Sequence, residues 1–238
     1  MVRETRRGEG RVALLSGAGR GIGAAIAAWL AEEGWQLSLG IREPRASDWR
    51  TADAVQVHRY TAGDPAAEAR WVAAALERFG RIDAIVANAG IMIPKTVVEI
   101  EDSDLDAMFE VNVKAPRRLV REAWPSLAES GRGRVVILAS LSGKRVKTAR
   151  AGSYSLSKFA AVALAHGIRH AGFDAGIRAT AVCPGFVATD MARSLTDTPD
   201  ADMTDPRDVA RIVAMLLDLP NQASVAEFTV NCRLEDSY

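Results

Sequence analysis

The sequence predicts a single α/β domain with a doubly wound parallel sheet, and three observations favour this fold. Short apolar runs typical of buried strands alternate with longer runs of helical composition. A glycine-rich segment separates the first strand from the first helix. The 238 residues contain no internal repeat, low-complexity tract or dividing linker, so one domain is expected over residues 11–238.

The predicted elements alternate in chain order. Strands are expected at 11–16, 35–41, 54–59, 82–87, 134–140, 177–183 and 226–231. Helices are expected at 21–33, 64–79, 101–129, 153–172 and 205–218. Right-handed crossovers place the carboxyl ends of such strands along one edge of the sheet, where ligands bind in folds of this type. Side chains that follow the first, fourth, fifth and sixth strands should therefore meet at this edge.

The first strand and the first helix flank the glycine-rich segment. Val12 to Leu15 form an apolar run, and Ala24 to Glu33 form an alanine-rich helical run. Glycine lets the backbone approach a pyrophosphate, and a helix N-terminus offers free N–H groups and a positive dipole end. The segment predicts a Rossmann-like dinucleotide-binding unit, with a turn that binds nothing as the alternative; its glycines are Gly17, Gly19, Gly21 and Gly23.

A tyrosine and a lysine lie one turn apart in the helix predicted at 153–172. Tyr154 and Lys158 are four residues apart, so their Cβ atoms would share one face at roughly 5–6 Å. A free phenol has a pKa of about 10, and a nearby positive charge lowers that value. The pair predicts a proton donor or acceptor for general acid–base chemistry near neutral pH, with an ordinary helix surface as the alternative.

The overall composition argues against several classes of protein. The formal net charge is zero, so attraction to nucleic acid is not expected. No apolar stretch reaches the ~18 residues of a membrane span, and the charged residues 1–10 are expected to form a disordered tail. Cys183 and Cys232 have neither zinc nor redox spacing, so we expect a reduced, cytoplasmic protein without a metal site.

Several motifs follow one another in a defined order. They are Gly17-x-x-x-Gly21-x-Gly23, then Ala87-Asn88-Ala89-Gly90, then Asn112, Ser140, Tyr154 and Lys158, and finally Pro184-Gly185. This set resembles the short-chain dehydrogenase/reductase family from about Val12 to Met191. The resemblance implies a single Rossmann-like domain that binds NAD or NADP. It also implies an oxidoreductase that transfers a hydride between nicotinamide and a carbonyl or secondary alcohol.

The resemblance implies a role for each catalytic residue. Tyr154 would exchange a proton with the substrate oxygen, and Lys158 would lower the pKa of Tyr154 and bind the nicotinamide ribose. Ser140 would hold and polarise the substrate oxygen. Ser142 is a rival, but the family pattern Ser-x-x-Gly matches Ser140. Asn112 would organise a water that links Lys158 to solvent.

The cofactor contacts implied by the resemblance are spread along the chain. Asn88 would shape the site after the fourth strand, and Val187 and Thr189 would bind the carboxamide of the nicotinamide. Thr61-Ala62 stand where the family often has an Asp-Val pair at the adenine. The full expected set is Gly17, Gly19, Arg20, Gly21, Ile22, Gly23, Arg42, Thr61, Asn88, Ala89, Gly90, Tyr154, Lys158, Pro184, Gly185, Val187 and Thr189.

The end of the second strand favours NADP(H) over NAD(H). An acidic residue there binds the ribose 2′-hydroxyl, whereas a basic residue accommodates a 2′-phosphate. Ile41 stands where NAD-preferring members of the family have Asp, and Arg42 follows it. A guanidinium suits a phosphate, and Arg20 would close on the same group. Glu43 adds a nearby negative charge, and two arginines on a solvated surface are the alternative.

The loop from Lys144 to Gly152 should border the substrate, because it leads into the helix of Tyr154. Its cations predict an anionic small-molecule substrate, with a solvated basic loop as the alternative; they are Lys144, Arg145, Lys147 and Arg150. A Leu-Pro before a Val-x-Glu strand at the carboxyl end resembles NADP-dependent hydroxy-acid and serine dehydrogenases more than 3-oxoacyl-carrier-protein reductases.

Alternatives to this function and the state of assembly follow from the same comparison with the family. A catalytically silent sensor or scaffold would be expected to lack the tyrosine or the lysine. A nucleotide-sugar epimerase would be expected to carry a C-terminal substrate domain. The helices predicted at 101–129 and 153–172 would pair to form a homodimer or homotetramer, without a membrane or nucleic-acid partner.

Overall fold

The computed structural model describes residues 8–44 and 53–234. Most of the tail expected at residues 1–10 lies outside this range. The Gly8 amide donates a hydrogen bond to the Glu33 carbonyl oxygen at 3.0 Å. A Cβ added at Gly8 would lie 2.1 Å from the Trp35 side chain, so residues 8–10 form a turn packed at the start of the second strand rather than part of a tail.

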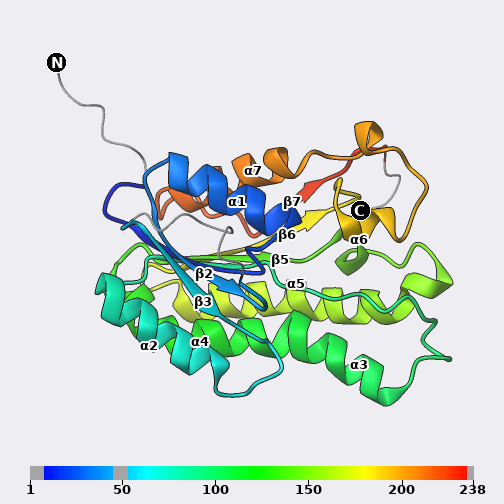
Figure 1. The fold of residues 1–238 in the computed structure, drawn as a ribbon, viewed down its shortest axis with the longest axis horizontal. Coiled ribbons are helices and arrows are strands. Elements are labelled where there is room, and N and C mark those ends of the chain that lie inside the picture. Colours follow the sequence, from blue (N-terminus) through cyan, green and yellow to red (C-terminus); the bar gives the residue numbers. More distant parts are fainter. Residues whose placement is uncertain (1–7, 45–52, 235–238) are drawn as a thin grey trace.

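Seven strands of the described chain form one parallel sheet in the order β3-β2-β1-β4-β5-β6-β7 (Figure 1). The chain begins in the middle of the sheet, builds outward to β3, crosses back and builds outward to β7. This is the doubly wound topology that the sequence predicts. The strands are β1 (Val12–Ser16), β2 (Gln36–Ile41), β3 (Val55–Arg59), β4 (Ala84–Ala87), β5 (Arg134–Leu138), β6 (Arg178–Pro184) and β7 (Glu227–Val230).

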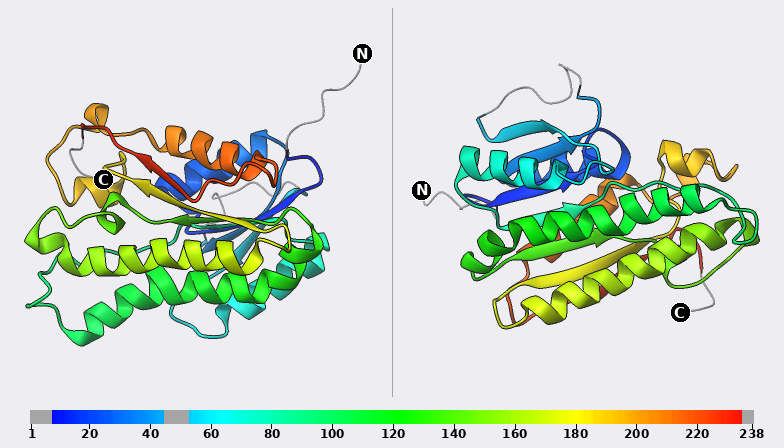
Figure 2. Two further views of the ribbon diagram at one scale, coloured as in Figure 1. Left: turned by 180° about the vertical axis from the view of Figure 1, so that it is seen from behind. Right: turned by 90° about the horizontal axis from the view of Figure 1, so that it is seen from below.

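Helices cover both faces of the sheet (Figures 1 and 2). Each helical layer encloses its own apolar core, and successive residues of β1 alternate between the two. Leu14 packs with the layer of α2, α4 and α5, and Leu15 packs with the layer of α1 and α7. Because both faces are buried, the central strand β4 is an unbroken apolar run and β1 is apolar up to Ser16, whereas the edge strand β3 alternates apolar and polar residues. These helices are α1 (Gly21–Glu32), α2 (Ala67–Phe79), α4 (Ala115–Glu129), α5 (Gly152–Gly172) and α7 (Pro206–Asp218).

Two of the predicted helices differ in detail. The helix predicted at 64–79 begins only at Ala67, because the Asp64 side chain accepts a hydrogen bond from the Ala66 amide at 3.0 Å and turns the chain before the helix. The helix predicted at 101–129 consists of α3 (Asp102–Phe109), a π-helical turn (Glu110–Lys114) and α4. Such turns widen a helix locally and are frequent at functional sites.

The carboxyl ends of the strands form the edge at which the predicted site residues lie. A short helix, α6 (Asp190–Arg193), follows β6 beyond this edge.

None of the helices in the described residues combines the length and the apolar character that a membrane span requires.

Candidate active site

Helix α5 places two buried polar side chains beneath the carboxyl end of β5. The Tyr154 residue is 8% exposed and Lys158 is 4% exposed. The Lys158 Nζ atom donates a hydrogen bond to the Leu138 carbonyl oxygen at 2.8 Å and lies 5.6 Å from the centre of the Tyr154 ring. The one-turn spacing thus puts the phenol and the ammonium side by side, as predicted.

Burial shifts the two pKa values in opposite directions. It lowers the pKa of Lys158 from 10.5 to about 8, because the charged ammonium loses solvation. It raises the pKa of Tyr154 above its ordinary value, and a hydrogen bond with the Ser140 side chain opposes that rise. The expected lowering of the Tyr154 pKa by Lys158 is therefore wrong in this structure, because desolvation of the phenol dominates.

Ser140 follows β5 and lies where its hydroxyl reaches Tyr154. Its backbone is extended (φ −174°), and its Oγ atom accepts a hydrogen bond from the Ser142 amide at 3.1 Å. A Cβ added at Gly143 would lie 2.6 Å from the Lys158 carbonyl oxygen. The glycine of the Ser-x-x-Gly pattern therefore lets this turn pack directly on α5. Of the two serines, Ser140 is the one whose side chain is hydrogen-bonded to Tyr154.

The π-helical turn carries Asn112 into the interior. Its Oδ1 atom accepts from the Ile91 amide at 2.9 Å, and its Nδ2 group donates to the Ile91 carbonyl oxygen at 3.0 Å. The same Nδ2 group donates to Ser157 Oγ at 2.9 Å, and that hydroxyl donates to the Tyr154 carbonyl oxygen at 2.8 Å. Asn112 thereby joins the loop after β4 to α5. The sequence motifs gave no sign of the roles of Ile91 and Ser157.

Gly90 separates Asn112 from Lys158. A Cβ added at Gly90 would lie 3.3 Å from Asn112 Oδ1 and 3.6 Å from Lys158 Nζ. The amide oxygen and the ammonium therefore face the same small space beside the Gly90 backbone. The four predicted catalytic residues thus lie close together: Ser140 is beside Tyr154, and Asn112 and Lys158 face the space at Gly90.

The glycine turn is tied to the end of β4. Gly17 has a φ of +69° and Gly21 a φ of +55°, which other residues rarely adopt. The Asn88 Nδ2 group donates to the Ser16 and Gly17 carbonyl oxygens at 3.1 and 3.0 Å. The Ser16 hydroxyl accepts from the Asn88 and Ala89 amides, both at 3.1 Å. The sequence motifs gave no sign of the role of Ser16, because this residue ends an apolar strand.

The other glycines of the turn mark close approaches. A Cβ at Gly23 would lie 2.1 Å from the Gly17 carbonyl oxygen, so α1 begins directly against the turn. A Cβ at Gly19 would lie 3.2 Å from Ile41, and one at Gly21 would lie 3.2 Å from Thr189. The turn therefore lies between the end of β2 and the segment after β6, as the predicted cofactor contacts require.

Both predicted cofactor arginines lie on the surface. The Arg20 side chain is 79% exposed and its Nη1 atom lies 3.4 Å from Asp190 Oδ2. The Arg42 side chain is 72% exposed and its Nε atom lies 3.9 Å from Glu43 Oε1. Thr61, after β3, is also exposed. All three side chains therefore face solvent.

The segment after β6 is held by backbone contacts. The Gly185 amide donates to the Val230 carbonyl oxygen at 2.8 Å, and a Cβ at Gly185 would lie 2.2 Å from Asn231. Val187 pairs with Thr204 in an isolated parallel bridge. Thr189 Oγ1 accepts from the Ala192 amide at 3.4 Å and caps α6.

The basic loop before α5 is partly engaged by other groups. Lys144 forms an ion pair with Glu227, whose other oxygen lies 2.7 Å from His166 Nε2. The Arg150 Nε atom donates to the Pro94 carbonyl oxygen at 3.2 Å. The sequence could not reveal these partners, and they weaken the expectation that this loop attracts an anionic substrate.

Comparison with known proteins assigns the family. The model of the short chain dehydrogenase family matches residues 11–200. The chain therefore belongs to the short-chain dehydrogenase/reductase family of oxidoreductases, the family that its motifs resemble.

Individual proteins show how far the likeness extends. Agropine synthesis reductase of Rhizobium rhizogenes is 39% identical over 230 residues, which cover 94% of this chain and 53% of that protein. The chain thus spans about half the length of the curated agropine synthesis reductases that it matches. Two solved structures are similar at the level of the fold. An alcohol dehydrogenase of Thermococcus sibiricus, complexed with 5-hydroxy-NADP, has a TM-score of 0.81 at 28% identity over 94% of this chain and 99% of that chain. A 3-ketoacyl-(acyl-carrier-protein) reductase of Brucella melitensis, complexed with NADH, has a TM-score of 0.85 at 25% identity over 93% of this chain and 97% of that chain.

Proposed function

We propose that this chain is an NAD(P)-dependent oxidoreductase that transfers a hydride between nicotinamide and a carbonyl or secondary alcohol. The observation that carries the proposal is the grouping of buried Tyr154 and Lys158 with Ser140 and Asn112, at the sheet edge that holds the glycine turn. Membership of the short-chain dehydrogenase/reductase family supports the same class of reaction.

The residues at this edge fit a dinucleotide. Positive φ angles at Gly17 and Gly21 give a tight turn, and α1 starts at its end with free N–H groups suited to a pyrophosphate. Asn88 holds the turn from the side of β4. The nicotinamide, when bound, supplies or accepts the hydride. The contacts at Val187 and Thr189 would orient its carboxamide.

NADP(H) is the favoured cofactor. Among the described residues, Arg20 and Arg42 are each paired with one exposed carboxylate, and such weak pairs hold neither side chain firmly. A ribose 2′-phosphate would replace these pairs with charge-assisted hydrogen bonds to guanidinium groups. Ile41, at the end of β2, offers no carboxylate to a ribose 2′-hydroxyl.

The raised pKa of Tyr154 suits the reductive direction. A phenol with such a pKa is protonated at neutral pH and can donate to the oxygen of a carbonyl substrate as hydride arrives. The Ser140 hydroxyl would hold the same oxygen. Lys158, with a pKa of about 8, can release and regain a proton near neutral pH, and Asn112 faces it across Gly90. The name of the agropine synthesis reductase also supports a reduction.

Two further assignments concern the substrate and the assembly. The Brucella structure supports a 3-oxoacyl-carrier-protein reductase as a second candidate function. An anionic substrate stays a proposal, which reversal of the charges of Lys147 and Arg150 would test through the KM of the substrate.

A homodimer or homotetramer is proposed because α5 exposes Leu156 and Phe159 on its outer face, where 48% and 44% of these residues are exposed. Light scattering that shows a monomer would contradict it.

The test is the oxidation of NADPH and NADH over a panel of neutral, anionic and thioester-linked carbonyl compounds. Tyr154→Phe is the control, because it removes the phenolic hydroxyl and keeps the aromatic ring. Turnover by the wild type that is lost in the variant, with cofactor binding retained, is the expected result. Cofactor binding without turnover on any compound would favour a sensor, and absence of cofactor binding would overturn the assignment of the glycine turn.

A further inference from the structure

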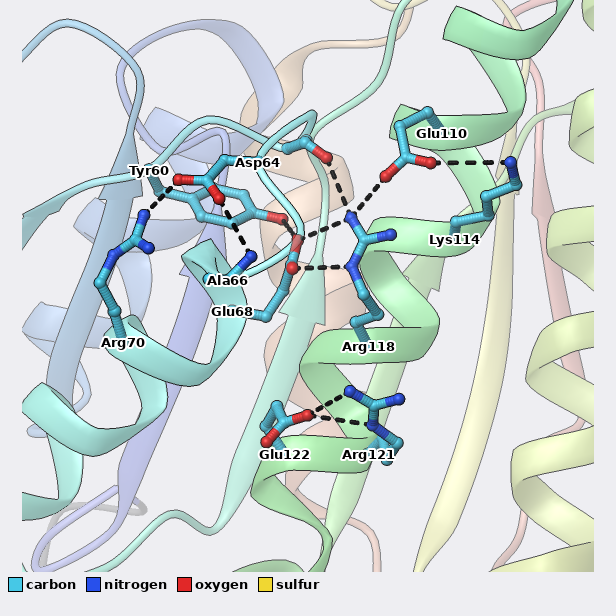
Figure 3. A network of polar contacts seen from close by, with 11 residues as sticks. Tyr60, Asp64, Ala66, Glu68, Arg70, Glu110, Lys114, Arg118, Arg121 and Glu122 are labelled. Atoms are coloured by element: carbon cyan, nitrogen blue, oxygen red, sulfur yellow. Dashed lines mark hydrogen bonds and ion pairs between the residues drawn. The ribbon is translucent and has the colours of Figure 1, made fainter.

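A buried ion-pair network lies beside the loop that follows β3 (Figure 3). The Arg118 guanidinium on α4 donates through Nε to Glu68 Oε2 at 2.8 Å. Its Nη2 group donates to Glu110 Oε1 at 2.5 Å and to the Ala62 carbonyl oxygen at 3.2 Å. The Tyr60 hydroxyl donates to Glu68 Oε1 at 2.8 Å. The Glu68 side chain is 1% exposed and that of Arg118 is 12% exposed, so water solvates neither charged group well.

Stability alone gives a weak reason for this network. The free energy lost when two charges leave water is about as large as the free energy gained from their attraction. Well-packed apolar residues therefore often stabilise a core equally well. A guanidinium nevertheless fits the site better than an ammonium, because its planar fork can serve several acceptors at fixed angles. In this network the Arg118 guanidinium contacts segments that are far apart in the sequence.

The three acceptors of Arg118 belong to three different segments. Ala62 lies in the loop after β3, next to Thr61, a position that the family resemblance places at the adenine of the cofactor. Glu110 is the first residue of the π-helical turn that carries Asn112. The third, Glu68, anchors the guanidinium on α2. One side chain is therefore bonded both to the loop expected at the adenine and to the turn that carries Asn112.

We propose that Arg118 is a positioning residue that holds the loop after β3 and the turn of Asn112 in a fixed relation. Binding of the adenosine half of the cofactor and placement of Asn112 then depend on the same guanidinium. This inference rests on the proposed function, and it adds a residue that touches neither the substrate nor the reacting atoms.

Two variants separate the arms of the network. Glu110→Gln weakens the arm to the π-helical turn and leaves the buried Glu68 paired. It should lower kcat about 5- to 50-fold while the Kd of adenosine 2′,5′-bisphosphate stays within about twofold. Arg118→Lys keeps the charge but loses the fork. It should lower kcat and also raise that Kd by about 3- to 20-fold. AMP replaces the bisphosphate as the probe if the enzyme uses NADH.

The matched control is Arg121→Lys, one turn further along α4. Arg121 pairs with the adjacent Glu122 at the surface, with 59% of its side chain exposed (Figure 3). The Arg121→Lys variant should change neither kcat nor the Kd of the adenosine bisphosphate. A purely structural role of Arg118 would lower the Tm of Arg118→Lys without moving kcat or the Kd, and that result would overturn the proposal.

Amide hydrogen exchange gives a readout that does not depend on turnover. In ligand-free Arg118→Lys, exchange should accelerate at both residues 61–64 and 110–114, compared with the wild type and Arg121→Lys. Unchanged exchange at either segment would overturn the fixed relation. If the wild type binds no cofactor and shows no turnover, the proposed function fails, while the exchange comparison still decides whether Arg118 joins the two segments.

Discussion

The Lys158 ammonium donates a hydrogen bond to the Leu138 carbonyl oxygen, 2.8 Å away, and so fastens α5 to the carboxyl end of β5. Leu138 is the last residue of the strand that leads into Ser140, and Lys158 lies one turn after Tyr154. The bond therefore fixes the phenol relative to the serine that reaches it. It also keeps an ammonium in the protein interior, where desolvation lowers its pKa to about 8.

The first prediction is that Lys158→Met abolishes activity but stabilises the fold near neutral pH. The folded-state pKa lies below the ordinary 10.5, so burial of the charged form penalises the fold below pH 8. The variant removes that penalty and loses one hydrogen bond, so its unfolding free energy at pH 7 should rise by about 1–3 kcal/mol. Denaturant unfolding at pH 7 and pH 10 measures it.

The gain should shrink as pH rises from 8 toward 10.5, because the wild-type lysine then loses its charge in both states. Lys95→Met is the control, because Lys95 forms a partly exposed pair with Asp104 and its removal should change the unfolding free energy little at either pH. A Lys158→Met protein that is less stable than the wild type at pH 7 would show that the bond to Leu138 outweighs the buried charge.

The second prediction concerns the space between Asn112 and Lys158. Gly90→Ala would put a methyl group 3.3 Å from the amide oxygen and 3.6 Å from the ammonium. If a proton passes through this space, kcat should fall about 10- to 100-fold. Steady-state kinetics and a melting curve measure the effect.

Gly167→Ala makes the same chemical change on α5, where an added Cβ meets nothing within 4 Å. It should leave kcat unchanged. An equal loss of kcat in both variants, or an unchanged kcat in Gly90→Ala, would remove the support for a relay beside Gly90.

The third prediction is that Arg42 contributes to the preference for NADPH. Arg42→Ala removes an exposed guanidinium at the end of β2, so the KM for NADPH should rise roughly 5- to 30-fold. The KM for NADH should stay nearly constant, because NADH has no 2′-phosphate. Arg121→Ala controls for loss of a surface cation. Equal changes for both cofactors would mean that Arg42 does not contact the 2′-phosphate.

The fold could be predicted closely because its central strands are buried on both faces. Apolar runs marked β1, β4 and β5, and the glycine turn marked the end of the first strand. The pairing of Tyr154 with Lys158 was also predictable, since one turn of helix suffices to bring them together. These features depend on local geometry, which the order of residues specifies directly.

Other features depend on contacts between distant segments and could not be predicted. The π-helical turn accompanies the bonds of Asn112 to the Ile91 backbone, which no helical pattern encodes. Lys144 is engaged by Glu227 on the last strand, so its charge could not be assigned to the substrate from the loop alone. The pKa of Tyr154 rises because tertiary packing removes water from the phenol, an effect that spacing does not reveal.

The last prediction tests that rise directly. Because burial raises the pKa of Tyr154, the phenol should stay protonated in the ligand-free protein throughout the neutral and mildly alkaline range. Ultraviolet difference titrations of the wild type and Tyr154→Phe should therefore coincide up to about pH 10. In catalysis, oxidation requires the phenolate and should accelerate with pH, whereas reduction uses the phenol and should not. An additional tyrosinate signal near pH 7 in the wild type would mean that Lys158 lowers the pKa of Tyr154 more strongly than burial raises it.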